Sequence, residues 1–194
     1  MKKKIRTIGI DDAAFCRNKS KKTFIFGVVT RGYSFVEGIL RGEIEIDGLD
    51  ATEKIIWMIE KSKFTTQLKA IFLASSTIAA FNVIDMNALF EQLNIPVITI
   101  LSKKPDEEKI RKALMHLEDG EKRYGILLSN PPMKRIKFKN KINREFEAIV
   151  QFTGVNKIDE VKEIIEKATF TSFLPESLRI ADLIGQTFKD YIIE

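Results

Sequence analysis

Two adjacent carboxylates, Asp11 and Asp12, follow a short apolar segment at residues 5–10, which reads IRTIGI. The segment predicts a β-strand, and a carboxylate at the tip of a strand is held rigidly where solvent and substrate can reach it. The two residues are therefore suited to binding a divalent metal ion. The alternative is that both end the strand as turn formers or caps.

A third acidic residue, Asp50, stands at the start of a predicted helix that continues to about residue 63. Glu53 follows three residues later, which is the spacing of a capping box with Asp in the capping position. Asp50 therefore has two candidate roles, helix capping and metal binding. In the second role, we expect the strand end and the helix start to converge, so that Asp11 and Asp50 share one acidic pocket.

The composition predicts one globular domain over residues 1–194. The chain is 44% hydrophobic and contains 14 phenylalanines, which is enough for a substantial core. Its only cysteine, Cys16, excludes an internal disulfide and indicates a reducing compartment. No apolar run reaches the roughly 20 residues of a membrane helix. We therefore predict a cytoplasmic protein that does not contact a membrane.

The net charge of +5 favours an acidic partner such as nucleic acid. Residues 135–141, RIKFKNK, alternate as a strand does, with Ile136 and Phe138 on one face. The opposite face carries four cations: Arg135, Lys137, Lys139 and Lys141. These cations suit a phosphate backbone. They equally suit an edge strand that resists pairing with another chain.

Hydrophobic periodicity and turn signals predict the elements that position these residues. Strands are expected at residues 5–10, 23–30, 34–46, 68–73, 95–101, 124–129, 135–141 and 146–153. Helices are expected at residues 50–63, 82–93, 105–117, 158–168 and 175–191. Three strands in succession imply an antiparallel meander, and the later alternation implies parallel strands with right-handed crossovers.

This order predicts an α/β fold with a ribonuclease H-like mixed sheet: three antiparallel strands, then alternating helices and parallel strands. A basic strand and hairpin region at about 124–153 and a helical C-terminus complete the single domain. The assignment is an analogy of fold and carries no function by itself.

Four stretches resemble the archaeal UPF0215 family, also described as endonuclease dU, which is related in fold to endonuclease V. They are IRTIGIDD, VEGILRGEIEIDGLDATE, FNVIDMNALFEQLNIPVI and LPESLRIADLI. The resemblance runs over nearly the whole chain. It implies DNA or RNA as the partner and cleavage near deaminated bases, with Mg²⁺ or Mn²⁺ held by carboxylates.

Matched to the family pattern, Asp11 takes the place of the first-strand metal ligand and Asp50 that of the second acid. Lys103 falls near the position where endonuclease V has a lysine close to the scissile phosphate. The third acid is missing, because relatives read Leu-Asp-Gly where this chain has Ala74 after the strand at residues 68–73. Three further acids are candidate replacements: Asp12, Asp47 and Asp85.

Two-metal phosphodiester cleavage requires several carboxylates around the ions. We therefore predict an endonuclease V-like protein with a degraded metal site, which binds DNA or RNA with little or no cleavage, with or without bound metal. The first alternative is an active Mg²⁺-dependent endonuclease that uses Asp11, Asp50 and Lys103. The second is a homodimeric assembly module. Asp182 lies on the last predicted helix, where this fold often places another acid, but we interpret it as part of a solvated helix face.

Overall fold

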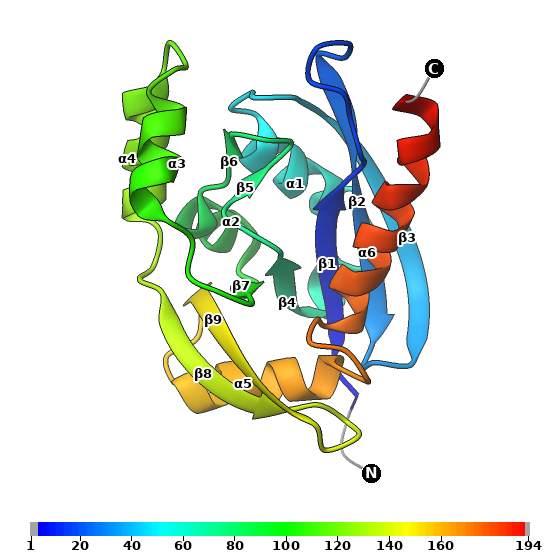
Figure 1. Cartoon of the computed structure of the whole chain (residues 1–194). Coiled ribbons are helices and arrows are strands. Elements are labelled where there is room, and N and C mark those ends of the chain that lie inside the picture. Colours follow the sequence, from blue (N-terminus) through cyan, green and yellow to red (C-terminus); the bar gives the residue numbers. More distant parts are fainter. Residues whose placement is uncertain (1–3, 193–194) are drawn as a thin grey trace.

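A mixed β-sheet forms the centre of the molecule. The computed structural model describes residues 4–192, and within them seven strands make this sheet (Figure 1). In spatial order they are β3 (Phe35–Glu45), β2 (Lys22–Arg31), β1 (Arg6–Asp12), β4 (Leu68–Leu73), β7 (Val97–Leu101), β9 (Glu145–Thr153) and β8 (Lys134–Lys139). A separate small hairpin consists of β5 (Thr77–Ile78) and β6 (Asn82–Val83).

The pairing confirms the predicted α/β topology. β1, β2 and β3 form an antiparallel meander, and β1, β4 and β7 are mutually parallel. β9 and β8 then add an antiparallel hairpin. The carboxyl ends of β1, β4 and β7 therefore meet at one edge of the sheet, where ligands bind in open α/β sheets.

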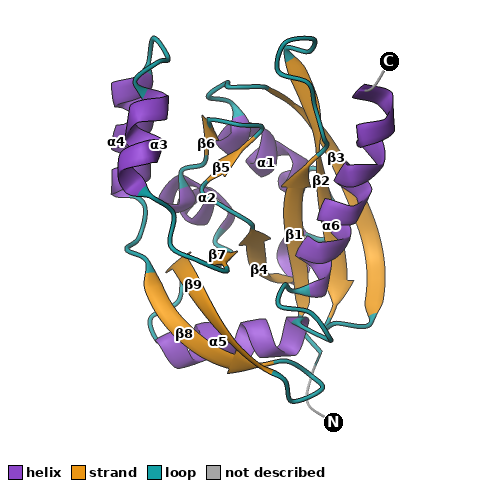
Figure 2. Cartoon of the chain, in the orientation of Figure 1, coloured by secondary structure: helices purple, strands orange, loops and turns teal. Residues whose placement is uncertain are grey.

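Helices lie on both faces of the sheet (Figure 2). They are α1 (Ala51–Glu60), α2 (Met86–Leu93), α3 (Glu107–Leu114), α4 (Gly120–Ser129), α5 (Ile158–Ala168) and α6 (Glu176–Gln186), with short 3₁₀ segments η1 (Thr65–Gln67) and η2 (Thr187–Ile192). No helix in the described part of the chain has the length and apolar character needed to cross a membrane.

Strand alternation divides the core into two clusters. Ile8 and Ile10 of β1 belong to the cluster that contains α1 and α2. The other cluster contains residues of α5 and α6, including the buried Leu178. Because successive strand side chains point to opposite faces, Asp11 points to the α6 side of the sheet, and Asp12 to the α1 side.

Two element predictions are wrong. Residues 124–129 belong to α4, because a short apolar run fits a helix as well as a strand. The expected helix at residues 82–93 begins only at Met86. Asn82 is buried, accepts the N–H of Ala51 and donates to the carbonyl of Glu45, so it fixes the start of α1 instead of continuing a helix.

β8 is an edge strand, as the alternation at residues 135–141 suggested. Ile136 and Phe138 are buried, whereas Lys137 and Lys139 are exposed. Arg135 forms an ion pair with Glu147 of β9. Binding of nucleic acid by this strand remains a prediction.

Candidate functional site

A small hollow at the end of β1 collects acidic side chains from both ends of the chain. We call it the acid hollow. It has a volume of about 180 Å³ and is lined by Asp11, Asp12, Ala13, Ala14, Phe15, Asp182, Gly185, Gln186 and Lys189. α6 runs beside β1 in Figure 1, which brings Asp182 to Asp11. The interpretation of Asp182 as a solvated helix face missed this proximity.

Two glycines allow α6 to approach β1 so closely. A Cβ on Gly9 would lie 2.1 Å from the backbone nitrogen of Leu178. A Cβ on Gly185 would lie 2.1 Å from the carbonyl oxygen of Asp12. The N–H of Ala14 donates to the carbonyl of Gly185 at 3.0 Å and fixes this contact. The backbone packing therefore sets the position of Asp182.

The acid hollow disfavours negative charge. Burial raises the pKa of Asp11 to about 7, and the neighbouring charges of Asp12 and Asp182 act in the same direction. Burial also raises the pKa of Asp12, although hydrogen bonds with Asp11 and Ala79 oppose this rise. Lys189 supplies one cation at the rim. A second cation in the hollow would relieve the repulsion between the carboxylates.

Asp12 links the acid hollow to the β5–β6 hairpin. Its Oδ2 accepts the N–H of Ala79 at 3.0 Å. Ala79 and Ala80 have φ of 45° and 68°, a conformation that favours glycine. The carboxylate of Asp12 thus stabilises the strained turn at Ala79 and Ala80. This structural role is sufficient to explain the orientation of the Asp12 side chain.

Ala74 directly follows β4, the strand that pairs with β1 on the side away from β2. The parallel register pairs Ile10 with Leu73, and the residues that follow these two along the chain are Asp11 and Ala74. The methyl group of Ala74 packs against the apolar cluster on the α6 side. An uncharged side chain therefore stands where the neighbouring strand ends closest to Asp11.

The other predicted site residues lie outside the acid hollow. Oδ1 of Asp50 accepts the Nδ2 of Asn82 at 2.7 Å and the N–H of Glu45 at 3.2 Å. The predicted capping box does not form, because the side chain of Asp50 makes no capping bond to α1. Asp50 precedes α1, whose buried residues belong to the cluster on the face opposite to α6, and Asp50 is not among the residues that line the acid hollow with Asp11.

Asp85 and Lys103 are also separate. Asp85 caps α2, since its Oδ1 accepts the N–H of Ala88 at 2.9 Å. The interpretation of Asp85 as a residue within a helix is therefore wrong. Lys103 is exposed in the loop after β7. Within residues 4–192, no three acidic, histidine or cysteine side chains are close enough together to hold one metal ion.

Asp47, the remaining candidate, is engaged in a structural network. Its carboxylate accepts two hydrogen bonds from Arg17 and the N–H of Phe81. The bond from Arg17 lowers the pKa of Asp47. Arg123 is buried and donates to the carbonyl of Phe81 at 2.7 Å, so two arginines hold this phenylalanine in place.

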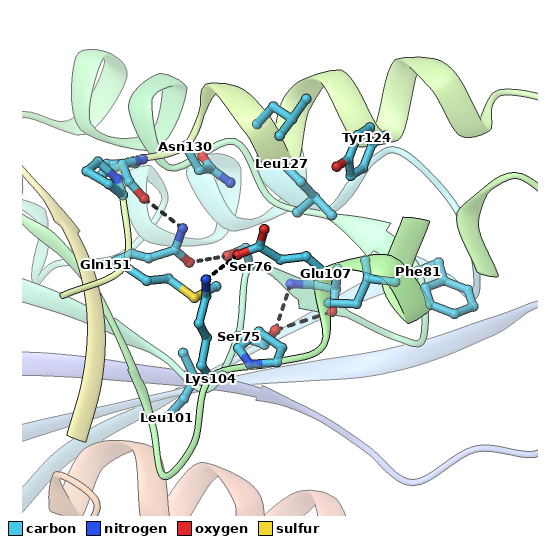
Figure 3. Close-up of a pocket in the computed structure, with 17 residues that line it drawn as sticks. Ser75, Ser76, Phe81, Leu101, Lys104, Glu107, Tyr124, Leu127, Asn130 and Gln151 are labelled. Carbon is cyan, nitrogen blue, oxygen red and sulfur yellow. Dashed lines mark hydrogen bonds and ion pairs between the residues drawn. The ribbon is translucent and has the colours of Figure 1, made fainter. Parts of the chain in front are cut away.

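A larger pocket lies at the same edge of the sheet, between the ends of β4 and β7 and the α3–α4 pair (Figure 3). We call it the apolar pocket. Its volume is about 370 Å³, and its walls include Phe81, Leu101, Ile110, Tyr124, Leu127 and Leu128. Segment 75–81 contributes to this pocket and, through Ala79, contacts Asp12 of the acid hollow.

A few polar side chains line the apolar pocket. Oγ of Ser76 donates to Oε1 of Gln151 at 2.7 Å, and Nε2 of Gln151 donates to the carbonyl of Pro131 at 2.8 Å. Lys104 and Glu107, which also line the pocket, form an ion pair at 2.8 Å (Figure 3). Apolar walls with a few oriented polar groups are typical of small-molecule and base-binding pockets.

Comparison with known proteins identifies the family. The family model described as endonuclease dU matches residues 3–189. The chain belongs to the endonuclease dU family. A UPF0215 protein of Methanosarcina barkeri is 39% identical over 185 residues, which cover 95% of this chain and 91% of the relative. A UPF0215 protein of Pyrococcus furiosus is 37% identical, with 95% and 92% covered. The resemblance seen in the sequence is thus confirmed.

Solved structures place this endonuclease dU family member in the ribonuclease H-like fold of endonuclease V. A protein of unknown function from Archaeoglobus fulgidus aligns with a TM-score of 0.82 and 34% identity, covering 94% of this chain and 96% of that protein. Endonuclease V of Ciona intestinalis, solved with an inosine-containing DNA, aligns with a TM-score of 0.59 and 12% identity, covering 100% and 88%. The predicted fold class is therefore confirmed.

Proposed function

We propose that this protein binds DNA or RNA at the edge of the sheet that carries the acid hollow and the apolar pocket, and cleaves it slowly or not at all. Its endonuclease V-like fold supports the choice of partner, since the Ciona intestinalis endonuclease V with that fold was solved with DNA. The proposal of weak cleavage depends on one observation: Leu73, the last residue of β4, pairs with Ile10, the residue before Asp11, and the uncharged Ala74 follows Leu73.

The acid hollow is a poor fit to a pair of Mg²⁺ or Mn²⁺ ions. Its carboxylate oxygens are the donor type that Mg²⁺ prefers. However, Asp12 is engaged by Ala79, Asp50 by Asn82, and Ala74 offers no oxygen from its side chain. Asp11 accepts the N–H of Asp12 at 3.0 Å and Asp182 accepts the Nε2 of Gln186 at 2.6 Å, so these two carboxylates would supply only a few oxygens to one weakly held ion. Because two-ion hydrolysis needs more ligands than these, we derive no catalytic step through a metal.

The apolar pocket suits one unpaired base. Phe81 and Tyr124 supply aromatic rings, and Ser75, Ser76 and Gln151 supply polar atoms for the edge of a base. A base enters such a pocket most readily from a mismatched, damaged or single-stranded position. The acid hollow, with Lys189 in its lining, would then face the backbone of the same nucleic-acid strand, and the exposed Lys103 after β7 is a second candidate phosphate contact.

Binding and cleavage are tested together. Fluorescence anisotropy measures the affinity for oligonucleotides that contain inosine, uracil or only normal bases, as DNA and as RNA. Gel analysis with Mg²⁺ or Mn²⁺ measures cleavage. We expect binding that weakens with salt, and cleavage no faster than for Asp11→Ala. An absence of binding at low salt would refute the proposed function.

A gain-of-function variant tests the reason for weak cleavage. Ala74→Asp places a carboxylate beside Asp11, so we expect tighter Mn²⁺ binding than for the wild type. Ala74→Asn is the matched control, because it has nearly the same size without the charge. Equal Mn²⁺ affinity of both variants and the wild type would show that Ala74 does not limit the site.

An active endonuclease remains the second candidate, because Asp182 lines the acid hollow together with Asp11 and adds a carboxylate there. Under this candidate, Asp11 and Asp182 hold the metal, and Asp182→Asn abolishes cleavage as completely as Asp11→Asn. Cleavage by the wild type that clearly exceeds that of both variants would favour this candidate over binding alone.

A further inference from the structure

Aromatic and basic side chains gather at the other end of β1, away from the acid hollow. We call this surface the aromatic–basic patch and define it by Lys4, Arg31, Tyr33, Phe35, Lys141 and Phe170. These residues come from the start of β1, the β2–β3 turn, the β8–β9 loop and the α5–α6 loop, which meet near the N-terminus in Figure 1. The seven residues of β1 separate the patch from Asp12 by roughly 20 Å at about 3.3 Å per residue.

Two rings of the patch stack on each other, and the patch still exposes aromatic surface to solvent. Tyr33 and Phe170 stack with their centroids 5.1 Å apart and an interplanar angle of 8°. Phe170 is still 41% exposed, and Phe35 is 49% exposed. Exposed aromatic area of this kind is costly in water and is suited to stacking against a base.

The cations of the patch are held over these rings. The Nζ atoms of Lys4 and Lys141 each lie 5.9 Å from the centroid of Tyr33, and Nζ of Lys4 lies 4.4 Å from that of Phe35. Two like charges around one ring repel each other, and an anion between them would relieve that repulsion. Arg31 adds little net positive charge to the patch, because Glu37 pairs with it at 2.9 Å.

The backbone fixes two parts of the patch to one another. The N–H of Lys141 donates to the carbonyl of Thr169, the residue before Phe170, at 3.3 Å. Oδ1 of the buried Asn140 accepts the N–H groups of Ile142 and Arg144, which orders the β8–β9 loop. The cation and the ring are therefore positioned before any partner binds, which lowers the entropic cost of binding.

We propose that the aromatic–basic patch binds a single-stranded segment of nucleic acid, with phosphates at Lys4 and Lys141 and bases against Phe35 and Phe170. The choice of nucleic acid rests on the proposed function. The choice of a single strand rests on the patch, because only unpaired bases expose their faces to protein rings. The protein thus has a second contact region, outside the acid hollow and the apolar pocket.

The test measures binding of the full-length protein to a single strand of about 12 nucleotides without deaminated bases, and to the corresponding duplex. The variants are Lys4→Ala/Lys141→Ala, Phe35→Ala and Phe170→Leu, each checked for folding by thermal melting. Lys61→Ala and Trp57→Ala are the matched controls, because Lys61 and Trp57 are an exposed lysine and a 55% exposed aromatic at α1.

We expect the wild type to prefer the single strand. The double lysine variant should bind at least about fivefold more weakly, and the slope of log K against log salt should fall by about 1.4 for two lost phosphate contacts. Each phenylalanine variant should also lose about fivefold or more. The controls should stay within twofold of the wild type.

Unchanged single-strand affinity of the patch variants would overturn this inference while leaving the proposed function intact. Loss of binding only in patch variants, with no effect of changes in the apolar pocket, would support the inference and count against the proposed function. Patch variants that alter only the binding of anionic lipid vesicles would assign the surface to a membrane and overturn the inference. No binding of any oligonucleotide by the wild type would refute both.

Discussion

Asp11 of β1 and Asp182 of α6 line the same hollow, although they come from opposite ends of the chain. The contact depends on Gly9 and Gly185, where α6 touches the backbone of β1. The negative charge of Asp182 contributes to the raised pKa of Asp11. This relationship connects the packing of the last helix with the electrostatics of the first strand.

Replacing Asp11 with Asn should stabilise the protein at high pH. The pKa of Asp11 rises from 3.8 to about 7 on folding, so the folded state binds the proton more tightly. Its contribution to stability is therefore largest below about pH 4 and is lost as pH rises to 7, by roughly 4 kcal/mol at most. The Tm of Asp11→Asn minus the Tm of the wild type should therefore increase from pH 5 to pH 8, as measured by circular dichroism.

The matched control for this pH effect is Glu118→Gln, which removes an exposed carboxylate in the α3–α4 connection. We expect its Tm difference from the wild type to be nearly the same at both pH values. If the Tm difference of Asp11→Asn is also independent of pH, the carboxylate of Asp11 is not destabilised by its surroundings.

Mn²⁺ should raise the Tm more at pH 8 than at pH 6. A cation binds the ionised form of Asp11, which predominates only above the raised pKa. At a free Mn²⁺ concentration tenfold above Kd, the expected stabilisation is about 1.4 kcal/mol. The shift should disappear in Asp11→Asn and shrink in Asp182→Asn. A Tm shift of equal size in the wild type and in both variants would mean that Mn²⁺ binds outside the acid hollow.

Asp50→Asn separates a structural from a metal-binding role. Asn keeps the oxygen that accepts the hydrogen bonds from Asn82 and Glu45, so we expect little change in Tm. Asp50→Ala removes this oxygen and should cost about 1–2 kcal/mol. Neither variant should change the Mn²⁺ shift. A lost Mn²⁺ shift in Asp50→Asn would restore Asp50 as a ligand.

A methyl group at Gly185 should separate α6 from β1. Gly185→Ala places a Cβ 2.1 Å from the carbonyl oxygen of Asp12, so one of the two elements must move. We expect a loss of about 2–4 kcal/mol in the free energy of unfolding, measured with urea. Gly125→Ala in α4 is the control, because its Cβ meets nothing within 4 Å. It should stabilise the protein by about 0.5–1 kcal/mol.

If Gly185→Ala unfolds no more easily than the wild type, the close contact between α6 and β1 does not hold Asp182 in place. In a folded Gly185→Ala variant, we also expect a weaker Mn²⁺ shift, because Asp182 moves away from Asp11.

The sequence by itself determined most of the sheet. The period-two pattern of β8, the continuous apolar run of β2 and the succession of three strands are local signals, and they predicted both pairing and direction. The same signals placed Asp11 at the tip of β1. Local patterns gave the wrong secondary structure at residues 124–129 and at Asn82. At both places the conformation depends on contacts with residues distant in the sequence.

Only the tertiary structure decided which acids meet. Asp11 lies near the end of β1, Asp50 and Asp85 directly precede helices, and Asp182 lies within α6. No local pattern in the sequence says which of these acids share a site. The side of the sheet on which each helix packs separates them: strand alternation points Asp11 toward α6, and Asp50 stands before α1 on the opposite face. Which face a helix covers depends on contacts such as that of Gly9 with Leu178, and such contacts have no local signature in the chain.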